Sequence, residues 1–86
     1  MSIHTKAITK LGTEIQLVVA TEEMSELTKE LCKYKRGHEN IPHIIEEIAD
    51  VEIMLERLKI IFDIHEEVEQ QKVYKLNRLE ERLKGE

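Results

Sequence analysis

Apolar residues recur every three to four positions along most of this chain, which is the spacing of helices rather than strands. The pattern predicts a short helix over residues 2–10 and three long helices over residues 14–36, 41–62 and 64–83. With only three glycines and one proline, the chain also has few of the turn signals that a β protein needs. We therefore expect an all-α fold, and 86 residues without a linker or a long repeat form one domain, 1–86.

The boundaries of these helices carry start and stop signals. Thr13 with Gln16, and Asp63 with Glu66, have the spacing of capping boxes, so each pair is expected to start a helix. No Gly or Pro separates the third predicted helix from the residues that follow it, so the break there depends on the second pair. Other boundary residues are, in chain order, Ser2, Gly12, Gly37, Asn40 and Pro42.

The two central helices show apolar residues on more than one side. The third helix has a continuous stripe and a neighbouring one, and the second helix is apolar on two opposite sides, which is typical of a helix buried between neighbours. We expect a small antiparallel helical bundle of three long helices plus the short N-terminal one. Since so small a domain buries only roughly 60% of its unfolded surface, we expect oligomerisation to complete it. The main stripe of the third helix is Ile44, Ile48, Val51, Leu55, Leu58 and Phe62; the neighbouring one is Glu47, Met54 and Ile61.

Two acidic stretches interrupt these apolar patterns, at residues 22–26 and 46–50. In each, two carboxylates lie three residues apart and so share a helix face: Glu23 with Glu26, and Glu47 with Asp50. If the two helices run antiparallel around Gly37, the pairs lie at similar height, within about one helical turn. Four carboxylates can then converge, and a hard divalent cation, Mg²⁺ or alternatively Mn²⁺, would offset their repulsion. Taken singly, each pair also fits an ordinary solvated helix face.

Charge and cysteine content restrict the setting. A net charge of −5 and a pI near 5.4 argue against DNA or RNA binding as the main task. The single cysteine, Cys32, leaves no internal disulfide and suits a reducing cytosol. The first residues lack the apolar core of a signal peptide, and no apolar run is long enough to span a membrane. We therefore expect a cytoplasmic protein without a membrane partner.

The acidic stretches also resemble a known family. Residues 22–26 read as EExxE and residues 47–50 as ExxD, with 20 residues between Glu26 and Glu47. This combination resembles the MazG-like members of the all-α nucleoside triphosphate pyrophosphohydrolases, over roughly residues 11–83. The resemblance implies a helical bundle that binds Mg²⁺ and hydrolyses an NTP or dNTP to the monophosphate and pyrophosphate.

The resemblance also assigns roles to residues of this chain. It implies that Glu23, Glu26, Glu47 and Asp50 are the metal ligands and that Glu22 supports them or positions the attacking water. Among the basic residues of the last helix, Lys75 and Arg78 are the expected phosphate contacts. Because the chain has no Trp, base stacking falls to Tyr34, Phe62 or Tyr74, or to a partner subunit. A homo-dimer or homo-tetramer is expected, as in similar proteins.

The sequence also fits an alternative hypothesis, in which the protein has no catalytic activity. The chain could be a noncatalytic helical oligomerisation or adaptor module whose acidic pairs are surface features. The two readings differ in one respect that can be measured, since only the first predicts that Mg²⁺ or Mn²⁺ stabilises the fold.

Overall fold

The computed structural model describes residues 1–85, and within them it contains four helices and no strand. The helices are α1 (Ile3–Leu11), α2 (Thr13–Lys35), α3 (Ile41–Phe62) and α4 (His65–Lys84). The all-α prediction is confirmed, and each predicted boundary lies within one or two residues of the observed one. Within the described residues, none of the helices has both the length and the apolar character needed to cross a lipid bilayer.

The chemistry of the helix starts differs from the prediction at two places. Ser2 does cap α1, since its hydroxyl accepts a hydrogen bond from the backbone N–H of Thr5 at 3.1 Å. The capping box at Thr13 is wrong: Gly12 occupies the N-cap position of α2, and no side chain caps that helix. Gln16 is instead buried and accepts a hydrogen bond from Arg57 at 3.1 Å. A charged donor from α3 therefore competes successfully for the side chain that the box would have used.

The break between α3 and α4 is confirmed, but its predicted cause is wrong. Asp63 ends α3 in a left-handed conformation, with φ 55°, and does not begin α4. The N–H groups of Asp63 and Ile64 donate to carbonyl groups of the last turn of α3, at 3.2 and 3.1 Å. Ile64 then takes the N-cap position of α4 without a side-chain cap. The chain direction changes here because the backbone closes α3, which leaves Asp63 unavailable as a cap.

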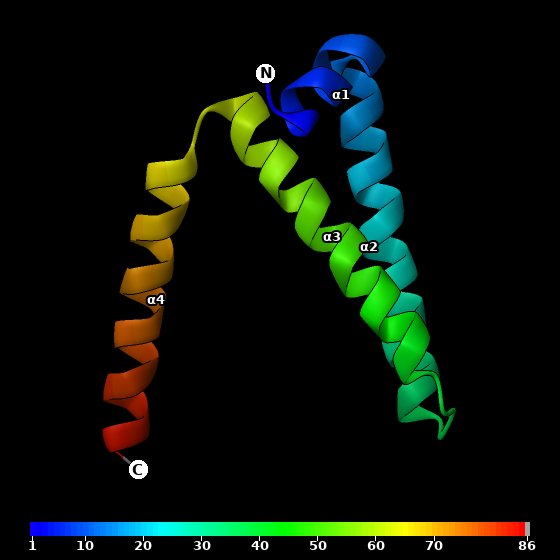
Figure 1. Ribbon diagram of the computed structural model, residues 1–86. Coiled ribbons are helices and arrows are strands. Elements are labelled where there is room, and N and C mark those ends of the chain that lie inside the picture. The colour runs from blue at the N-terminus through cyan, green and yellow to red at the C-terminus, as the bar shows by residue number, and fades with distance from the viewer. Residues whose placement is uncertain (86) are drawn as a thin grey trace.

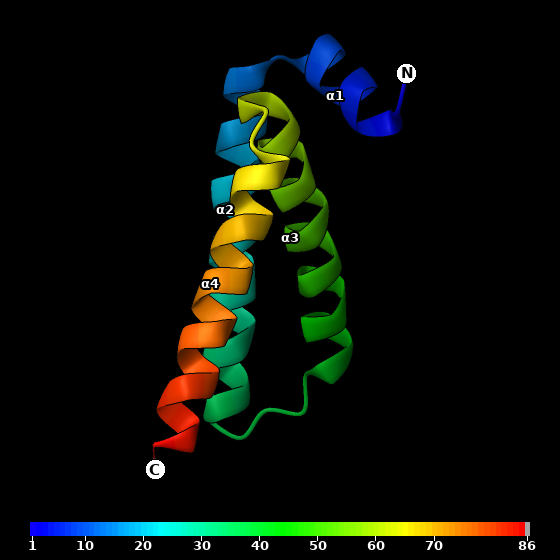
Figure 2. The same ribbon diagram turned by 90° about the vertical axis from the view of Figure 1, so that its left-hand side faces the viewer.

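α2 and α3 pack as an antiparallel hairpin, and α1 lies against its open end, where α2 begins and α3 finishes (Figures 1 and 2). α4 leaves the end of α3 and runs away from the hairpin, so that the chain forms an open V in Figure 1. Among the described helices, α4 contacts only α3. The Cα radius of gyration is 16.2 Å, whereas a compact chain of this length has about 12 Å. Within one chain, therefore, only α2 and α3 of the three long helices pack together along their length. The structure does not confirm the predicted bundle, because α4 does not join them.

The interior of the hairpin is unusually polar. Among the described residues, five are buried: Gln16, Ala20, Glu30, Asn40 and Met54. Three of these five are polar or charged, and the aliphatic side chains of the chain lie mainly outside. Polar groups inside a helix pair have to be hydrogen-bonded or paired with charge, because burial alone costs free energy. This polar seam between α2 and α3 is where the acidic residues meet.

The main apolar stripe of α3 does not face α2. Met54, from the neighbouring stripe, is 3% exposed, whereas Ile48, Leu55 and Phe62 of the main stripe are 42–54% exposed. α2 likewise leaves Ile15 and Val18 open to solvent, so it is not buried between neighbours within one chain. α3 presents two apolar stripes, and the hairpin uses the one that contains Glu47 and Met54. The larger stripe is left for other contacts.

Candidate metal centre

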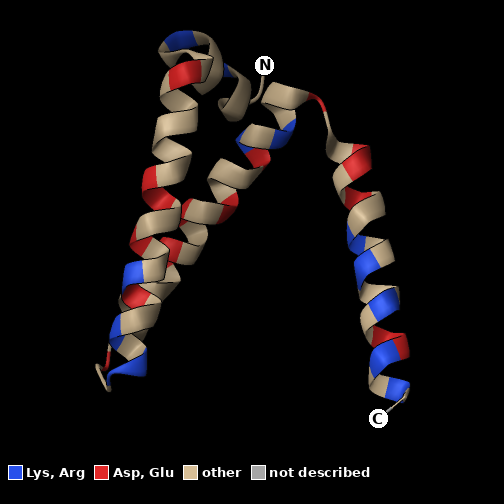
Figure 3. Cartoon of the chain, turned by 180° about the vertical axis from the view of Figure 1, so that it is seen from behind, with Lys and Arg blue, Asp and Glu red and all other residues tan. Residues whose placement is uncertain are grey.

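Three carboxylates from the two helices of the hairpin converge at mid-length. One oxygen from each of Glu23 on α2, and Glu47 and Asp50 on α3, lies within 4.8 Å of the others. Glu47 and Asp50 are one turn apart on the side of α3 that faces α2, and Glu23 lies one turn beyond the buried Ala20. Figure 3 shows acidic residues gathered in the middle of the hairpin. The antiparallel register predicted from the sequence therefore brings three of the four expected carboxylates together.

The charges of this cluster are not compensated by the chain itself. Burial, the charge of Asp50 and a hydrogen bond to Asp50 raise the pKa of the Glu23 carboxyl. Burial raises the pKa of Glu47 too, with further contributions from the charges of Asp50 and Glu26. Over residues 1–85, no Lys, Arg or His forms an ion pair with Glu23, Glu47 or Asp50. The arrangement concentrates negative charge where a cation would lower its energy.

One carboxylate oxygen of the trio lacks the hydrogen-bond partner that a buried acceptor needs. Oε2 of Glu47 is buried and has no hydrogen-bond partner among residues 1–85. An acceptor left in this state costs free energy, and a cation is one way to satisfy it. In an octahedral Mg²⁺ site with ligands at about 2.1 Å, opposite oxygens lie about 4.2 Å apart. Neighbouring oxygens of such a site lie only about 3.0 Å apart, so the three side chains, now within 4.8 Å of one another, would have to draw together around the ion, for which they supply the hard oxygen ligands that Mg²⁺ prefers.

The other two acidic residues of the EExxE stretch, Glu22 and Glu26, lie outside the converging trio. Glu26 is exposed, and its oxygens are not among the three that converge. Its charge still contributes to the raised pKa of both Glu23 and Glu47, which places it close enough to interact with them. Glu22 is exposed and belongs to no hydrogen bond or ion pair of the described chain. The structure thus separates the central trio from Glu26, which still acts on it through its charge, and from the exposed Glu22.

Sequence reasoning missed two residues of the polar seam, Glu30 and Asn40. The Asn40 side chain donates to the backbone oxygen of Glu30 at 2.9 Å and to its carboxylate at 3.1 Å. Lys33 pairs with the same carboxylate at 3.3 Å, and the bonds from Asn40 and Lys33 lower the pKa of Glu30. Glu30 is thus a compensated charge, and its field also raises the pKa of Glu47. The available signal was its position, seven residues after Glu23 on the same face of α2.

Asn40 stands at the N-cap position of α3, as the sequence predicts, but caps nothing. Its backbone precedes α3, and its side chain is directed to α2 instead of to the first turn of α3. Its Oδ1 atom is buried without a hydrogen-bond partner. Asn40 therefore ties the loop after α2 back to the end of that helix, below the carboxylate cluster.

The residues expected to contact phosphate or base are not brought to the carboxylates within one chain. Lys75 and Arg78 lie on α4, which does not contact α2, and the Arg78 guanidinium lies 5.6 Å from the centre of the Tyr74 ring. Basic residues follow one another along α4 in Figure 3. Tyr34 is in the last turn of α2 and is half exposed. A substrate at the carboxylates could reach Lys75 and Arg78 only if α4 came from a second chain or moved.

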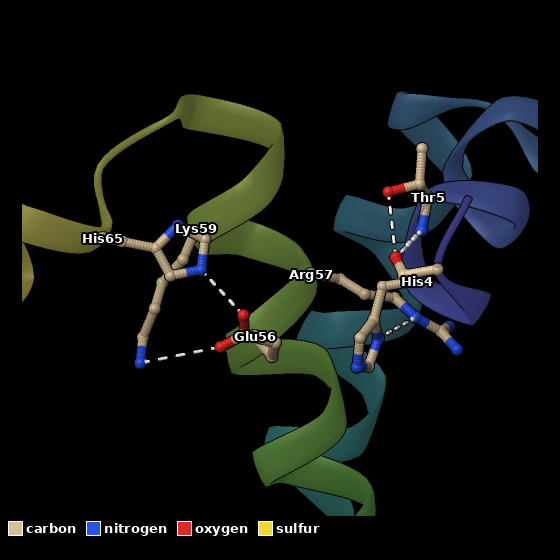
Figure 4. Close-up of polar contacts among 7 residues, drawn as sticks. His4, Thr5, Glu56, Arg57, Lys59 and His65 are labelled. Atoms are coloured by element: carbon tan, nitrogen blue, oxygen red, sulfur yellow. Dashed lines mark hydrogen bonds and ion pairs between the residues drawn. The ribbon is translucent and has the colours of Figure 1, made fainter.

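A second set of polar contacts holds the open end of the hairpin (Figure 4). Arg57 donates to Nδ1 of His4 at 3.3 Å and to Gln16 at 3.1 Å, which joins α1, α2 and α3. Across the α3–α4 break, His65 contacts Glu56 at 2.7 Å, and Lys59 approaches the same carboxylate at 3.9 Å. These contacts have an evident structural purpose, whereas the trio is the group of carboxylates in residues 1–85 whose oxygens converge closely enough to hold a metal ion.

Comparison with protein-family models, with curated proteins and with solved structures finds no match to this chain. The MazG-like resemblance therefore stays a prediction that rests on residues 22–26 and 47–50. The function has to be argued from the chain's own geometry.

Proposed function

We propose that this protein is a Mg²⁺-dependent nucleotide pyrophosphohydrolase, which converts a nucleoside triphosphate to the monophosphate and pyrophosphate. The observation that carries the proposal is the trio Glu23, Glu47 and Asp50, together with the buried, unpartnered Oε2 atom of Glu47. Hard oxygen ligands without a compensating cation suit Mg²⁺, which proteins commonly share with substrate phosphates. The MazG-like spacing of the same carboxylates supports the choice of reaction.

In the proposed site, Glu23, Glu47 and Asp50 hold the metal, and Glu26 joins them. When bound, Mg²⁺ supplies charge that stabilises the phosphoryl oxygens in the transition state. Glu22 is the carboxylate left over to orient a water and accept its proton. Its exposed position next to Glu23 in the chain, with no other partner in the described residues, supports this role.

The substrate needs groups that one chain does not place at the trio. Lys75 and Arg78 are proposed to contact the phosphates, and Tyr34 the base. Since α4 stands apart from α2, the proposed enzyme is a homo-dimer or homo-tetramer, in which a helical bundle is completed between chains. This assembly would supply the phosphate contacts from a second copy.

The proposal is tested by incubating the protein with Mg²⁺ and a panel of NTPs and dNTPs, followed by separation of the products. The expected result is equal amounts of monophosphate and pyrophosphate from at least one substrate, and none from the Glu47→Gln variant. Diphosphate and orthophosphate would instead indicate a phosphatase and contradict the proposed reaction. Absence of any turnover, in a folded protein that also ignores Mg²⁺ and Mn²⁺, would leave the noncatalytic helical module as the better description.

A further inference from the structure

The gap between α3 and α4 is apolar on both of its walls. Near the α3–α4 break it forms a groove of about 420 Å³, lined on one side by Leu55, Leu58 and Phe62 of α3. Ile64 and Val68, at the start of α4, line the other side. Beyond Val68 the two helices separate (Figure 1), and every residue of α4 from Glu69 onward is exposed. Apolar surface of this extent needs an occupant.

The wall formed by α3 has the pattern of a coiled-coil seam. Ile41, Ile48, Leu55 and Phe62 follow one another at intervals of seven residues, and each is between 42% and 54% exposed. A residue three positions after each of the first three is also apolar, which completes the a and d positions of three heptads. These intervening residues are Ile44, Val51 and Leu58. A seam of this kind is built to receive another helix along the full length of α3.

The wall formed by α4 offers such a helix. Leu76, Leu79 and Leu83 lie three and four residues apart on one face of α4, and all three are exposed. Of the helices in this chain, only α3 touches α4. An isolated helix of about 20 residues is only marginally stable in water, because most helical stability comes from packing an apolar face. α4 therefore requires a surface of the kind that α3 leaves open.

The amount of exposed surface indicates the size of the missing contact. The described chain exposes 6883 Å². A compact protein of 10.1 kDa exposes only about 5,300 Å². The excess is roughly 1,600 Å² per chain, or roughly 3,200 Å² for two chains, which falls within the range of about 2,000–5,000 Å² seen for obligate homodimers.

Charge favours a second copy of the same chain over an unrelated partner. On α3, Glu52 flanks the heptad seam on the side turned away from α2, whereas residues 70–79 of α4 contain Lys72, Lys75 and Arg78 and no carboxylate. Both complementary surfaces are thus present on one molecule. A two-fold axis pairs them twice, as an isologous interface requires.

We propose that the gap between α3 and α4 is the interface with a second copy, in which α4 of each chain lies along the heptad seam of its partner's α3. The two open V shapes interlock, and four helices enclose the apolar residues of both gaps. This inference depends only on the apolar and charged surfaces of α3 and α4. It stands or falls separately from the proposed enzymatic activity.

The test is the oligomeric state of four variants, measured by analytical ultracentrifugation. Leu55→Glu alters the α3 seam and Leu79→Glu the α4 face, while Ile53→Glu and Tyr74→Glu are the matched controls. Ile53 is 43% exposed against 42% for Leu55, yet at about 100° per residue it lies on a nearly opposite side of α3. Tyr74 is similarly turned away from Leu79. The wild type and both controls are expected to be dimeric, and both seam variants to lose the dimer at the same concentration.

Leu79→Glu keeps the test decisive even if Leu55→Glu fails to fold. α4 does not contact the α1–α2 part of the chain, so a charge at Leu79 leaves the hairpin intact, which circular dichroism would verify. Dimers that persist in both seam variants would overturn the proposal. So would a monomeric wild type, whether its radius of gyration by X-ray scattering is near 16.2 Å, or near the roughly 12 Å expected if α4 folds back on its own hairpin.

Discussion

Replacing Glu47 by Gln tests the metal centre with the smallest possible change in shape. In the wild type, Mg²⁺ at a hundredfold excess over its dissociation constant would stabilise the folded state by about 2.7 kcal/mol. For a chain of this length, 1 kcal/mol shifts the midpoint of thermal unfolding by about 4–8 °C, so the expected rise is roughly 10–20 °C. Gln keeps the volume of Glu47 but removes the charge and the unpartnered Oε2, so this rise should be lost.

The same variant should fold without metal at least as well as the wild type. Burial and nearby carboxylates raise the pKa of Glu47, which means that its ionised form is disfavoured in the folded state. The matched control is Glu52→Gln, the same chemical change on an exposed position of α3 that faces away from α2. The control should retain the full Mg²⁺ effect in differential scanning fluorimetry. A Mg²⁺ shift that is absent from the wild type, or unchanged in Glu47→Gln, would refute the reasoning.

Three further predictions concern the ionisation of Glu23 and Glu47, the hydrogen bonds of Asn40, and the basic residues of α4. Because the pKa values of Glu23 and Glu47 are raised above 4.5 in the folded state, their ionisation opposes folding, and the free energy of unfolding in metal-free buffer should rise as pH falls from 7 towards 4.5. Urea titrations of the wild type and of the Glu23→Gln/Glu47→Gln double variant measure this, and an equal rise in both would contradict it. Asn40→Ala removes two hydrogen bonds to α2 and should lower the free energy of unfolding by about 1–2 kcal/mol, again measured with urea. Lys75→Ala should lower kcat/KM by roughly 10- to 100-fold, because it removes one charge-assisted hydrogen bond to the substrate. The rise in the thermal unfolding midpoint caused by Mg²⁺ should stay unchanged. The control is Lys84→Ala, which loses only the ion pairs with Glu80 and Glu81.

Local spacing was enough to predict the helices and the convergence of the trio. The break at Gly37 and the rise of a helix fix the height of each residue in an antiparallel hairpin. For this reason Glu23, Glu47 and Asp50 could be expected to meet before any side chain was placed. The same reasoning could not tell whether the Glu26 carboxylate joins the trio, because Glu26 lies one helical turn beyond Glu23 and the predicted heights are uncertain by about one turn.

Choices between competing contacts could not be predicted from spacing. α3 carries two apolar stripes, and the buried Met54 shows that the hairpin uses the smaller one, since that is the side on which α2 supplies Gln16 and Glu30. Gln16 could cap α2 or accept from Arg57, and the partner lies 41 residues away. The position of α4 was also beyond local reasoning, because spacing along the chain does not show whether an apolar helix face packs on its own hairpin or stands apart from it.

The most direct test of the central claim is a crystal structure of the protein with Mn²⁺, with the metal located by anomalous diffraction. The account predicts an anomalous peak within about 2.5 Å of carboxylate oxygens from Glu23, Glu47 and Asp50, so that Oε2 of Glu47 gains its missing partner. Crystals grown in millimolar Mn²⁺ that show no peak there, with the three carboxylates open to solvent channels, would contradict the assignment of a metal centre.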